Sequence, residues 1–262
     1  NDFWMPAVLP WMRPSAGRVI ASIARFPKKQ FALYGRCEAI EPVSESVAAG
    51  IRSQTPSVAS KVVVVPNCVD AAFLEVPTGD ARRGEVRPVR IMFVGRLHPE
   101  KGLTLLAEAL GRLARGGWEG VLVGPVAEAE GGGGEAYVRG LREMAGGLPV
   151  VFEAPVYDLR ALAGVYDTAD IFVYPSVAET GESFGIAPLE AMARGVVPVV
   201  SGLEVFREYI EPGVNGVVFD HREGDAAGNL ASALSDLVGD ADKRCRMGAA
   251  ARATAEKFSP SA

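Results

Sequence analysis

The sequence predicts an α/β fold built on a doubly wound parallel sheet. From residue 89 onward, short apolar runs typical of buried strands alternate with stretches in which apolar residues recur at helical spacing. Most of these runs are apolar at nearly every position, as expected for strands covered on both faces. Of the 262 residues, 48% are hydrophobic and 23% are charged, which excludes a disordered chain, a coiled coil and a collagen-like repeat.

The elements of this larger part are expected in strict alternation along the chain. Strands are predicted at residues 89–95, 120–124, 150–152, 171–175, 196–200 and 216–219. Helices are predicted at residues 102–115, 135–145, 159–169 and 186–194, followed by a short helix near 205–210 and two late helices. Gly195 supplies the stop signal for the helix before it.

The first 75 or so residues carry weaker signals. Strands are expected at residues 39–44 and 61–66, with helices near 31–35 and 46–52. Two strands cannot make a full domain core by themselves. The family resemblance given below implies that residues 1–76 are the remnant of an N-terminal domain with its hinge. Residues 77–262 are predicted to form a C-terminal Rossmann-like domain, with the polar stretch 77–88 as linker. Since the chain does not open with methionine, we expect a fragment of a longer protein.

Charge and composition exclude several classes of function. The net charge is −5 and there is no Lys/Arg-rich block, so we expect no nucleic-acid partner. The three cysteines are far apart and there are only two histidines, which indicates a reducing compartment and no metal site. No run of 18 apolar residues is present to span a membrane.

Two cations follow the first predicted strand of the larger part. Gly95 lets the backbone turn at the end of this strand, and Arg96 and Lys101 come next, before a helix. Open α/β sheets bind ligands at this edge, and an arginine with a lysine suits a diphosphate. The alternative is a pair of solvated surface charges.

Two glutamates form the second candidate group. Glu182 lies on the loop after a predicted strand, and Gly185 opens a helix whose amides can hold an anion. Glu190 lies in the second turn of that helix among apolar neighbours, so its carboxylate needs donors, which a ribose diol would supply. Alternatively, Glu190 bonds a backbone turn and Glu182 is a solvated loop residue.

Seven segments in the same order carry a resemblance to a known family. They are residues 42–45, 65–70, 94–102, 169–176, 182–190, 195–200 and 213–216. Together they resemble the retaining glycosyltransferases of family four, which have the GT-B architecture, over roughly residues 39–258. The chain departs from the family pattern at Cys68, where a glycine usually precedes the hinge, and only Asp2 is visible of the family's His–Asp pair.

The resemblance assigns roles to individual residues. Arg96 and Lys101 would hold the diphosphate of a nucleotide sugar, Glu190 the ribose hydroxyls and Glu182 the donor sugar. Arg96, Lys101 and Glu182 are therefore the candidate catalytic residues. The other expected donor-binding residues are Gly95, Val156, Ser183, Phe184, Gly185 and Ile186. No resident cofactor is expected, because the nucleotide-diphosphate sugar is itself the donor substrate.

The implied function is hexosyl transfer with retention of configuration. A hexose-type sugar would move from the donor to a hydroxyl of a sugar, lipid or small-molecule acceptor. The fragment alone is expected to be inactive, since the acceptor-side domain is missing. A non-catalytic nucleotide-binding module and a GT-B phosphorylase or epimerase stay open as alternatives. A dinucleotide dehydrogenase is excluded, because no GxGxxG follows the strand at 89–95.

A cytoplasmic location is expected. The apolar opening segment, residues 3–12, is followed by Arg13 and Arg18. Two interpretations of this segment stay open: packing against the missing N-terminal domain, or weak contact with the inner face of the membrane.

Overall fold

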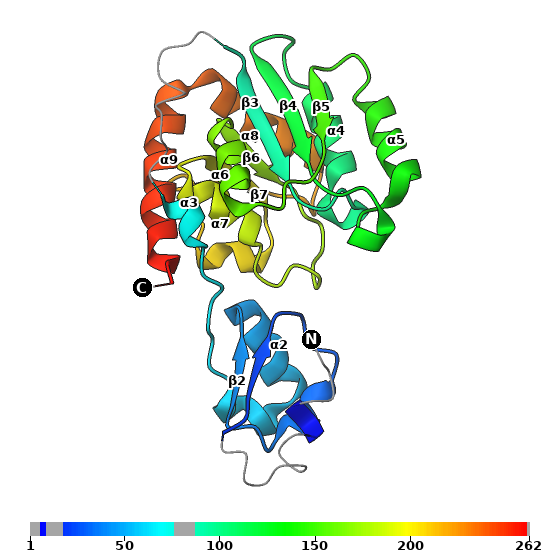
Figure 1. The fold of residues 1–262 in the computed structure, drawn as a ribbon. Coiled ribbons are helices and arrows are strands. Elements are labelled where there is room, and N and C mark those ends of the chain that lie inside the picture. Colours follow the sequence, from blue (N-terminus) through cyan, green and yellow to red (C-terminus); the bar gives the residue numbers. More distant parts are fainter. Residues whose placement is uncertain (1–5, 9–17, 76–86, 261–262) are drawn as a thin grey trace. The chain divides into compact units, whose positions relative to one another are not determined.

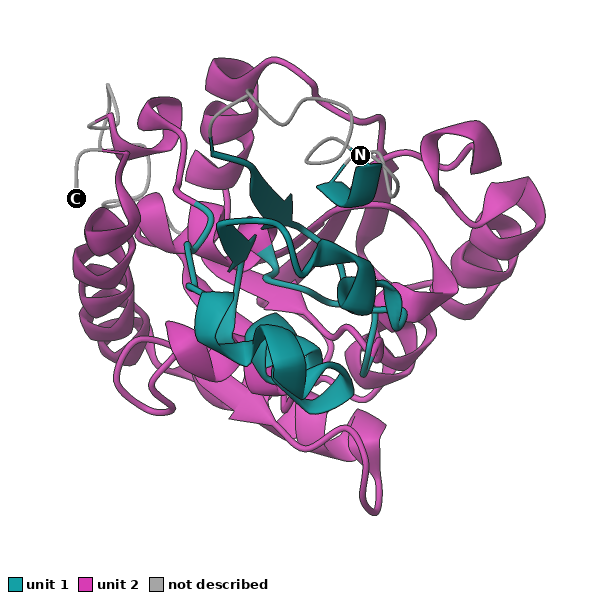
Figure 2. Ribbon diagram, turned by 90° about the horizontal axis from the view of Figure 1, so that it is seen from below, with its two compact units in different colours: residues 1–67, 179–185 teal, residues 68–178, 186–262 magenta. Residues whose placement is uncertain are grey.

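The computed structural model describes residues 6–8, 18–75 and 87–260 (Figure 1). The chain divides into two compact units, which Figure 2 colours teal and magenta. Unit 1 comprises residues 1–67 and 179–185, and unit 2 comprises residues 68–178 and 186–262. Most of the predicted linker 77–88 and most of the apolar opening segment lie outside the described residues.

Unit 2 contains one sheet of six strands, all parallel to their neighbours, in the order β5-β4-β3-β6-β7-β8. The strands are β3 (Val89–Val94), β4 (Trp118–Val123), β5 (Val150–Glu153), β6 (Ile171–Tyr174), β7 (Val197–Ser201) and β8 (Val217–Phe219). Because β6 pairs with β3 rather than with β5, the strand order reverses between β3 and β6. The predicted doubly wound parallel sheet is confirmed, and its topological switch point lies at this pair.

Helices connect the strands and cover the sheet. They are α3 (Ala71–Leu74), α4 (Leu103–Gly111), α5 (Gly134–Met144), α6 (Leu159–Asp167), α7 (Ile186–Ala193), α8 (Ala226–Gly239) and α9 (Ala241–Ala255). α4 packs on α5 and α8, while α7 packs on α3 and α9, so the helices form two groups (Figure 1). The short helix predicted near 205–210 is a 3-10 helix, Glu204–Glu208. α3 was not predicted.

The central strands are apolar because both of their faces are covered. Ile171, Phe172 and Val173 have no exposed surface. Tyr174, at the carboxyl end of β6, stacks on Phe93 and Phe172 with centroid distances of 5.7 and 6.1 Å. Burying each such side chain contributes about 1.5–3 kcal/mol to folding. Tyr174 is the last residue of β6 and so lies at the edge of the sheet where ligands bind in open α/β folds.

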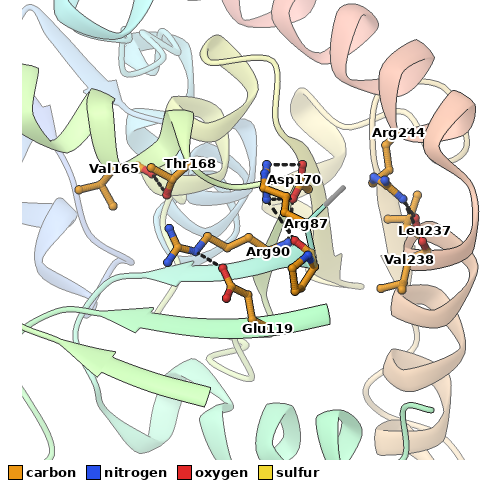
Figure 3. Close-up of polar contacts among 10 residues, drawn as sticks. Arg87, Arg90, Glu119, Val165, Thr168, Asp170, Leu237, Val238 and Arg244 are labelled. Carbon is orange, nitrogen blue, oxygen red and sulfur yellow. Dashed lines mark hydrogen bonds and ion pairs between the residues drawn. The ribbon is translucent and has the colours of Figure 1, made fainter. Parts of the chain in front are cut away.

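An ion-pair cluster fixes the opposite, amino end of the same strands (Figure 3). Arg87 donates two hydrogen bonds to the carboxylate of Asp170, at 2.8 and 3.0 Å. The same carboxylate accepts from the backbone N–H of Arg90 at 2.7 Å, and the Arg90 side chain lies 2.8 Å from Glu119. These contacts join the amino ends of β3, β4 and β6, so they stabilise the pairing of β3 with β6 at the switch point.

Two glycines allow the loops after β3 and β4 to touch. A Cβ on Gly124 would lie only 1.8 Å from the carbonyl oxygen of Gly95. Both residues have positive φ angles, +152° for Gly95 and +156° for Gly124. The amide of Gly95 donates to the carbonyl of Val123 at 3.0 Å. Only glycine fits this close approach of two backbones.

Unit 1 contains two parallel strands, β1 (Ile20–Ile23) and β2 (Ala39–Pro42). Its helix α2 (Glu45–Gln54) begins at Ser44, whose hydroxyl accepts from the amide of Val47 at 3.1 Å. The described core of this unit includes fully buried Phe31, Ile40 and Ile51. The helix expected near 31–35 is a 3-10 helix, Gln30–Tyr34, and a second one spans Pro56–Lys61.

The predicted strand at residues 61–66 is wrong as a regular strand. Val62 makes a single bridge with Ile40, and the amides of Val63 and Val65 donate to the carbonyls of Ile40 and Pro42 at 3.0 Å. The segment therefore runs beside β2 as an irregular edge. β1 was missed by sequence analysis because prolines before and after it obscure its short apolar run.

Replacing Gly124 with alanine should destabilise unit 2 by at least about 3 kcal/mol, because the added methyl group collides with a backbone carbonyl at a strained φ angle. Gly140 is the matched control, since it lies inside α5 and a Cβ there would meet nothing within 4 Å. Gly140→Ala should stabilise by about 0.5–1 kcal/mol. Urea unfolding of the three proteins measures both effects. Equal midpoints for the two variants would contradict the proposed close approach.

Candidate functional site

The residues predicted to bind a ligand are divided between the two units. Unit 2 contains Gly95, Arg96, Lys101, Val156, Ile186 and Glu190, and unit 1 contains Glu182, Ser183, Phe184 and Gly185. In unit 2, Gly95, Arg96 and Lys101 follow β3, and the chain that leads to α7 follows β6. These two strands flank the switch point, which is where open α/β sheets bind their ligands.

Lys101 is buried at this position. It ends a 3-10 turn, Pro99–Lys101, directly after β3 and before α4. The side chain is 7% exposed, and its Nζ lies 5.1 Å from the centroid of the Tyr174 ring. A cation over an aromatic face is attracted by the ring, and burial increases its attraction for an anion. The alternative of a solvated surface charge therefore does not hold for Lys101.

The turn that carries Lys101 is attached to the loop after β6. The carbonyl of Glu100 accepts from the amide of Val177 at 2.9 Å and from the hydroxyl of Ser176 at 3.3 Å. Gly102 has a φ of +67°, and a Cβ there would lie 2.0 Å from the carbonyl oxygen of Pro175. The turn after β3 and the loop after β6 are thus in direct backbone contact across the switch point. This contact fixes the position of Lys101.

Arg96 is more accessible than Lys101. Its side chain is 45% exposed, donates to the carbonyl of Gly131 at 3.0 Å and forms an ion pair with Glu100. The carbonyl of Leu97 accepts from Gly133 at 2.8 Å, so the loops after β3 and β4 form one assembly. A bound anion would compete with Glu100 for the guanidinium, which reduces the net gain from this cation.

Glu190 lies in the second turn of α7 and is held by a buried tyrosine. Its Oε2 accepts from the hydroxyl of Tyr166 at 2.9 Å, and Tyr166 has no exposed surface. Burial raises the pKa of Glu190, the hydrogen bond from Tyr166 opposes this shift, and the charge of Asp70 adds to it. This donor is a side chain rather than a backbone turn, so one donor that we expected from a ligand comes from the protein.

Tyr166 is itself fixed by aromatic and backbone contacts. Its ring lies 5.8 Å from Phe73 of α3 and 5.6 Å from Phe172 of β6. Burial and the carboxylate of Glu190 raise the pKa of Tyr166 well above its ordinary value, so the phenol keeps its proton and its role as donor. Arg194 donates to the carbonyl of Phe73 at 3.1 Å and ties α3 to the end of α7.

In unit 1, the segment Glu179–Gly185 is exposed over its first three residues and buried or half-buried from Glu182 onward. Glu182 is 8% exposed and Phe184 is 2% exposed, so the alternative of a solvated loop glutamate does not hold. The hydroxyl of Ser183 donates to the carbonyl of Ala24, directly after β1, at 2.9 Å. Gly185 has a φ of +73° and leads into α7, which begins at Ile186.

Three residues near the edge have local roles. Val156 is half-buried after β5 and offers only backbone groups for polar contact. Next to it, the hydroxyl of Tyr157 donates to Glu130 at 2.9 Å. His98 caps the turn before Lys101, because its Nδ1 accepts from the amide of Glu100 at 3.3 Å. Within the described residues, no group of three or more His, Cys, Asp or Glu side chains is arranged to hold a metal ion.

Comparison with known proteins identifies the family and supports the fold. Residues 82–254 match the family described as Glycosyl transferases group 1, and the chain belongs to this family. It is 34% identical over 209 residues to a phosphatidyl-myo-inositol mannosyltransferase of Mycolicibacterium smegmatis, covering 78% of this chain and 49% of that protein. It is 31% identical to a D-inositol 3-phosphate glycosyltransferase of Paenarthrobacter aurescens, covering 80% of this chain and 54% of that one. The chain thus spans about half the length of these curated relatives.

Solved structures share the fold. The structure of Anabaena Alr3699/HepE in complex with UDP superposes with a TM-score of 0.83 at 21% identity, covering 99% of this chain and 73% of that one. The sucrose-phosphate synthase of Thermosynechococcus elongatus gives 0.80 at 20% identity, covering 98% and 68%. The expected GT-B fold is therefore confirmed. Across the residues that the structure describes, no helix is long and apolar enough to cross a membrane.

Glu190→Gln should remove a pH-dependent loss of stability. The folded pKa of Glu190 is raised, so its contribution to stability is fully present below its ordinary pKa of 4.5 and is lost as the pH rises through the folded value. The free energy of unfolding of the glutamine variant should therefore rise relative to wild type between about pH 4.5 and 7. The gain is about 1.4 kcal/mol for each unit by which the folded pKa of Glu190 exceeds its ordinary value. Glu108→Gln, at an exposed position of α4, is the control. Urea unfolding across this range measures the difference, and parallel curves for wild type and Glu190→Gln would contradict it.

Proposed function

We propose that the protein is a retaining glycosyltransferase of family four that uses a nucleotide-diphosphate hexose. The observation that carries the proposal is the buried Lys101, held beside Tyr174 at the switch point of a group 1 glycosyltransferase domain. Relatives named as a mannosyltransferase and as inositol phosphate glycosyltransferases support transfer of a hexose-type sugar. Structures of Anabaena HepE with UDP and with UDP-glucose support a nucleotide-sugar donor.

In this proposal Arg96 and Lys101 bind the diphosphate. The guanidinium can form a fork to two oxygens, and the buried ammonium acts as a point charge. Tyr166 holds one oxygen of Glu190, which orients the carboxylate so that it can accept from the ribose hydroxyls. Backbone groups at Gly95, Val156 and the start of α7 complete the donor site.

The donor sugar is assigned to the segment Glu179–Gly185. Glu182 would accept from its hydroxyls, with Ser183, Phe184 and Gly185 supplying backbone contacts. During transfer, the bond between the anomeric carbon and the diphosphate oxygen breaks, and the acceptor hydroxyl forms its bond on the same face and passes its proton to the departing phosphate oxygen. Negative charge builds on the departing phosphate oxygen, where Arg96 and Lys101 stabilise it.

The domain roles belong to the same proposal. Residues 77–262 would be the donor-binding domain and residues 1–76 part of the acceptor-side domain, acting in the cytoplasm. The 262-residue chain alone would bind nucleoside diphosphate without transferring sugar, with transfer requiring a full-length protein. A module that only binds nucleotide would give no product, either as the 262-residue chain or as the full-length protein. A phosphorylase would instead release sugar phosphate when supplied with inorganic phosphate.

Removing either cation should weaken diphosphate binding. Lys101→Met retains an apolar stem over Tyr174, and Arg96→Ala removes the half-exposed guanidinium. Each should cost about 1.5–3 kcal/mol in affinity for UDP, with Arg96 at the lower end because Glu100 already neutralises it. Calorimetric titration with UDP and with uridine measures the effect, and uridine binding should hardly change. Arg115→Ala, at an exposed position, is the control. Equal losses for UDP and uridine would make the two cations structural.

The two glutamates should have separable effects. Glu190→Gln should weaken binding of both UDP and the nucleotide sugar by about 1–3 kcal/mol, because it loses charge and acceptor capacity toward ribose. Glu182→Gln should spare UDP, weaken the nucleotide sugar and lower turnover by the full-length enzyme. Titrations with both ligands test this division. If Glu182→Gln weakens UDP as much as Glu190→Gln does, the roles assigned here are wrong.

A further inference from the structure

Ser201 is a fully buried serine at the carboxyl edge of the sheet in unit 2. It is the last residue of β7, which pairs with β6 on the side away from β3 (Figure 1). Ser201 has no exposed surface, and its hydroxyl donates to the carbonyl of Ser176, in the loop after β6, at 2.5 Å. Because a buried hydroxyl is costly unless it is hydrogen-bonded, this contact holds the loop against the end of β7.

The peptide bond between Ser176 and Val177 connects Ser201 to the turn after β3. Its carbonyl oxygen accepts from Ser201, and its N–H, on Val177, donates to the carbonyl of Glu100 at 2.9 Å. The hydroxyl of Ser176 donates to the same carbonyl of Glu100 at 3.3 Å. Since the C=O and N–H of a trans peptide point in opposite directions, this one peptide group links the end of β7 to the turn after β3.

The series of hydrogen bonds continues to the backbone of Lys101. The carbonyl of Glu100 belongs to the peptide bond whose N–H, on Lys101, donates to the carbonyl of His98 at 2.9 Å. Two peptide groups therefore lie in series between the hydroxyl of Ser201 and the turn that carries Lys101. Hydrogen bonds in series polarise and strengthen one another inside a protein. The donor at Ser201 thus strengthens the contact that holds Glu100 and Lys101 in place.

The position of the Lys101 ammonium follows from the backbone of this turn. Lys101 is 7% exposed, and its Nζ lies 5.1 Å from the centroid of the Tyr174 ring. A side chain enclosed in this way has few other places to go, so a shift of its backbone moves the ammonium. Charge-assisted hydrogen bonds to phosphate oxygens need N–O distances of about 2.7–2.9 Å, so even a small shift weakens them.

We propose that Ser201 is a positioning residue of the donor site and acts on the diphosphate through Lys101. The inference rests on the proposed function, in which Lys101 binds the diphosphate. Ser201 holds the peptide between Ser176 and Val177, and this peptide holds the turn that carries the lysine. The hydroxyl of Ser201 should therefore matter for ligands that contain the diphosphate and not for a nucleoside without it.

Calorimetric titration of the full-length protein with UDP and with uridine tests the proposal. Ser201→Ala removes the donor to Ser176 and should weaken UDP binding about fivefold, while uridine affinity changes by less than about twofold. Ser201→Cys keeps a weaker donor and should give an intermediate loss. The double variant Lys101→Met with Ser201→Ala should bind UDP as well as Lys101→Met alone, because the serine acts through the lysine.

Ser44→Ala is the matched control, because Ser44 is also fully buried and its hydroxyl accepts from the amide of Val47 in unit 1. This variant should lose stability and keep the wild-type ratio of UDP to uridine affinity. Urea unfolding shows which variants are folded under the titration conditions, and if Ser201→Ala is not, the Ser201→Cys protein decides by the same ratio.

Three results would overturn the inference: unchanged UDP binding by the Ser201 variants, an equal loss of uridine binding, or the same further loss of UDP binding in the Lys101→Met protein. The last two would make Ser201 a residue of general structure only. A wild-type protein that binds no UDP would instead refute the proposed donor site.

Discussion

The backbone contact between the turn after β3 and the loop after β6 determines where the proposed donor site can form. Gly102 lies against the carbonyl of Pro175, and the carbonyl of Glu100 accepts from Val177 and Ser176. A side chain at position 102 would separate these loops. The contact holds Lys101 over the ring of Tyr174, so contacts within the protein orient the cation. Such preorganisation reduces the cost of binding.

The charged residues at the two ends of the central strands differ in their surroundings. At the amino end, Asp170 accepts from Arg87 and from the backbone of Arg90, which neutralises each charge within the protein. At the carboxyl end, Lys101 lies buried over the ring of Tyr174, and Glu190 is largely buried in α7. Glu190 is stabilised by the phenol of Tyr166, yet burial still raises its pKa. A carboxylate with a raised pKa therefore lies where the proposed ligand binds, as expected of a functional edge.

Sequence analysis predicted the sheet of unit 2 because its strands are apolar runs separated by clear helical patterns and glycines. It located Lys101 and Glu190 because both follow strands in recognisable segments. It could not predict that Tyr166 holds Glu190, because that contact links α6 to α7 and depends on packing. The strand expected at residues 61–66 failed because runs of valine do not show whether a partner strand continues beside them. The burial of Glu182 likewise depends on tertiary packing, which a loop sequence does not encode locally.

Amide hydrogen exchange of the full-length protein, with and without UDP, tests the central claim most directly. The account predicts that UDP increases protection in the turn after β3, around Lys101, and in the first turns of α7, around Glu190, because both are assigned to the nucleotide. Amides beside Asp170, at the opposite end of the strands, should exchange at unchanged rates. Protection confined to the amino end, or no change at either segment while UDP is bound, would contradict a donor site at the β3–β6 switch point.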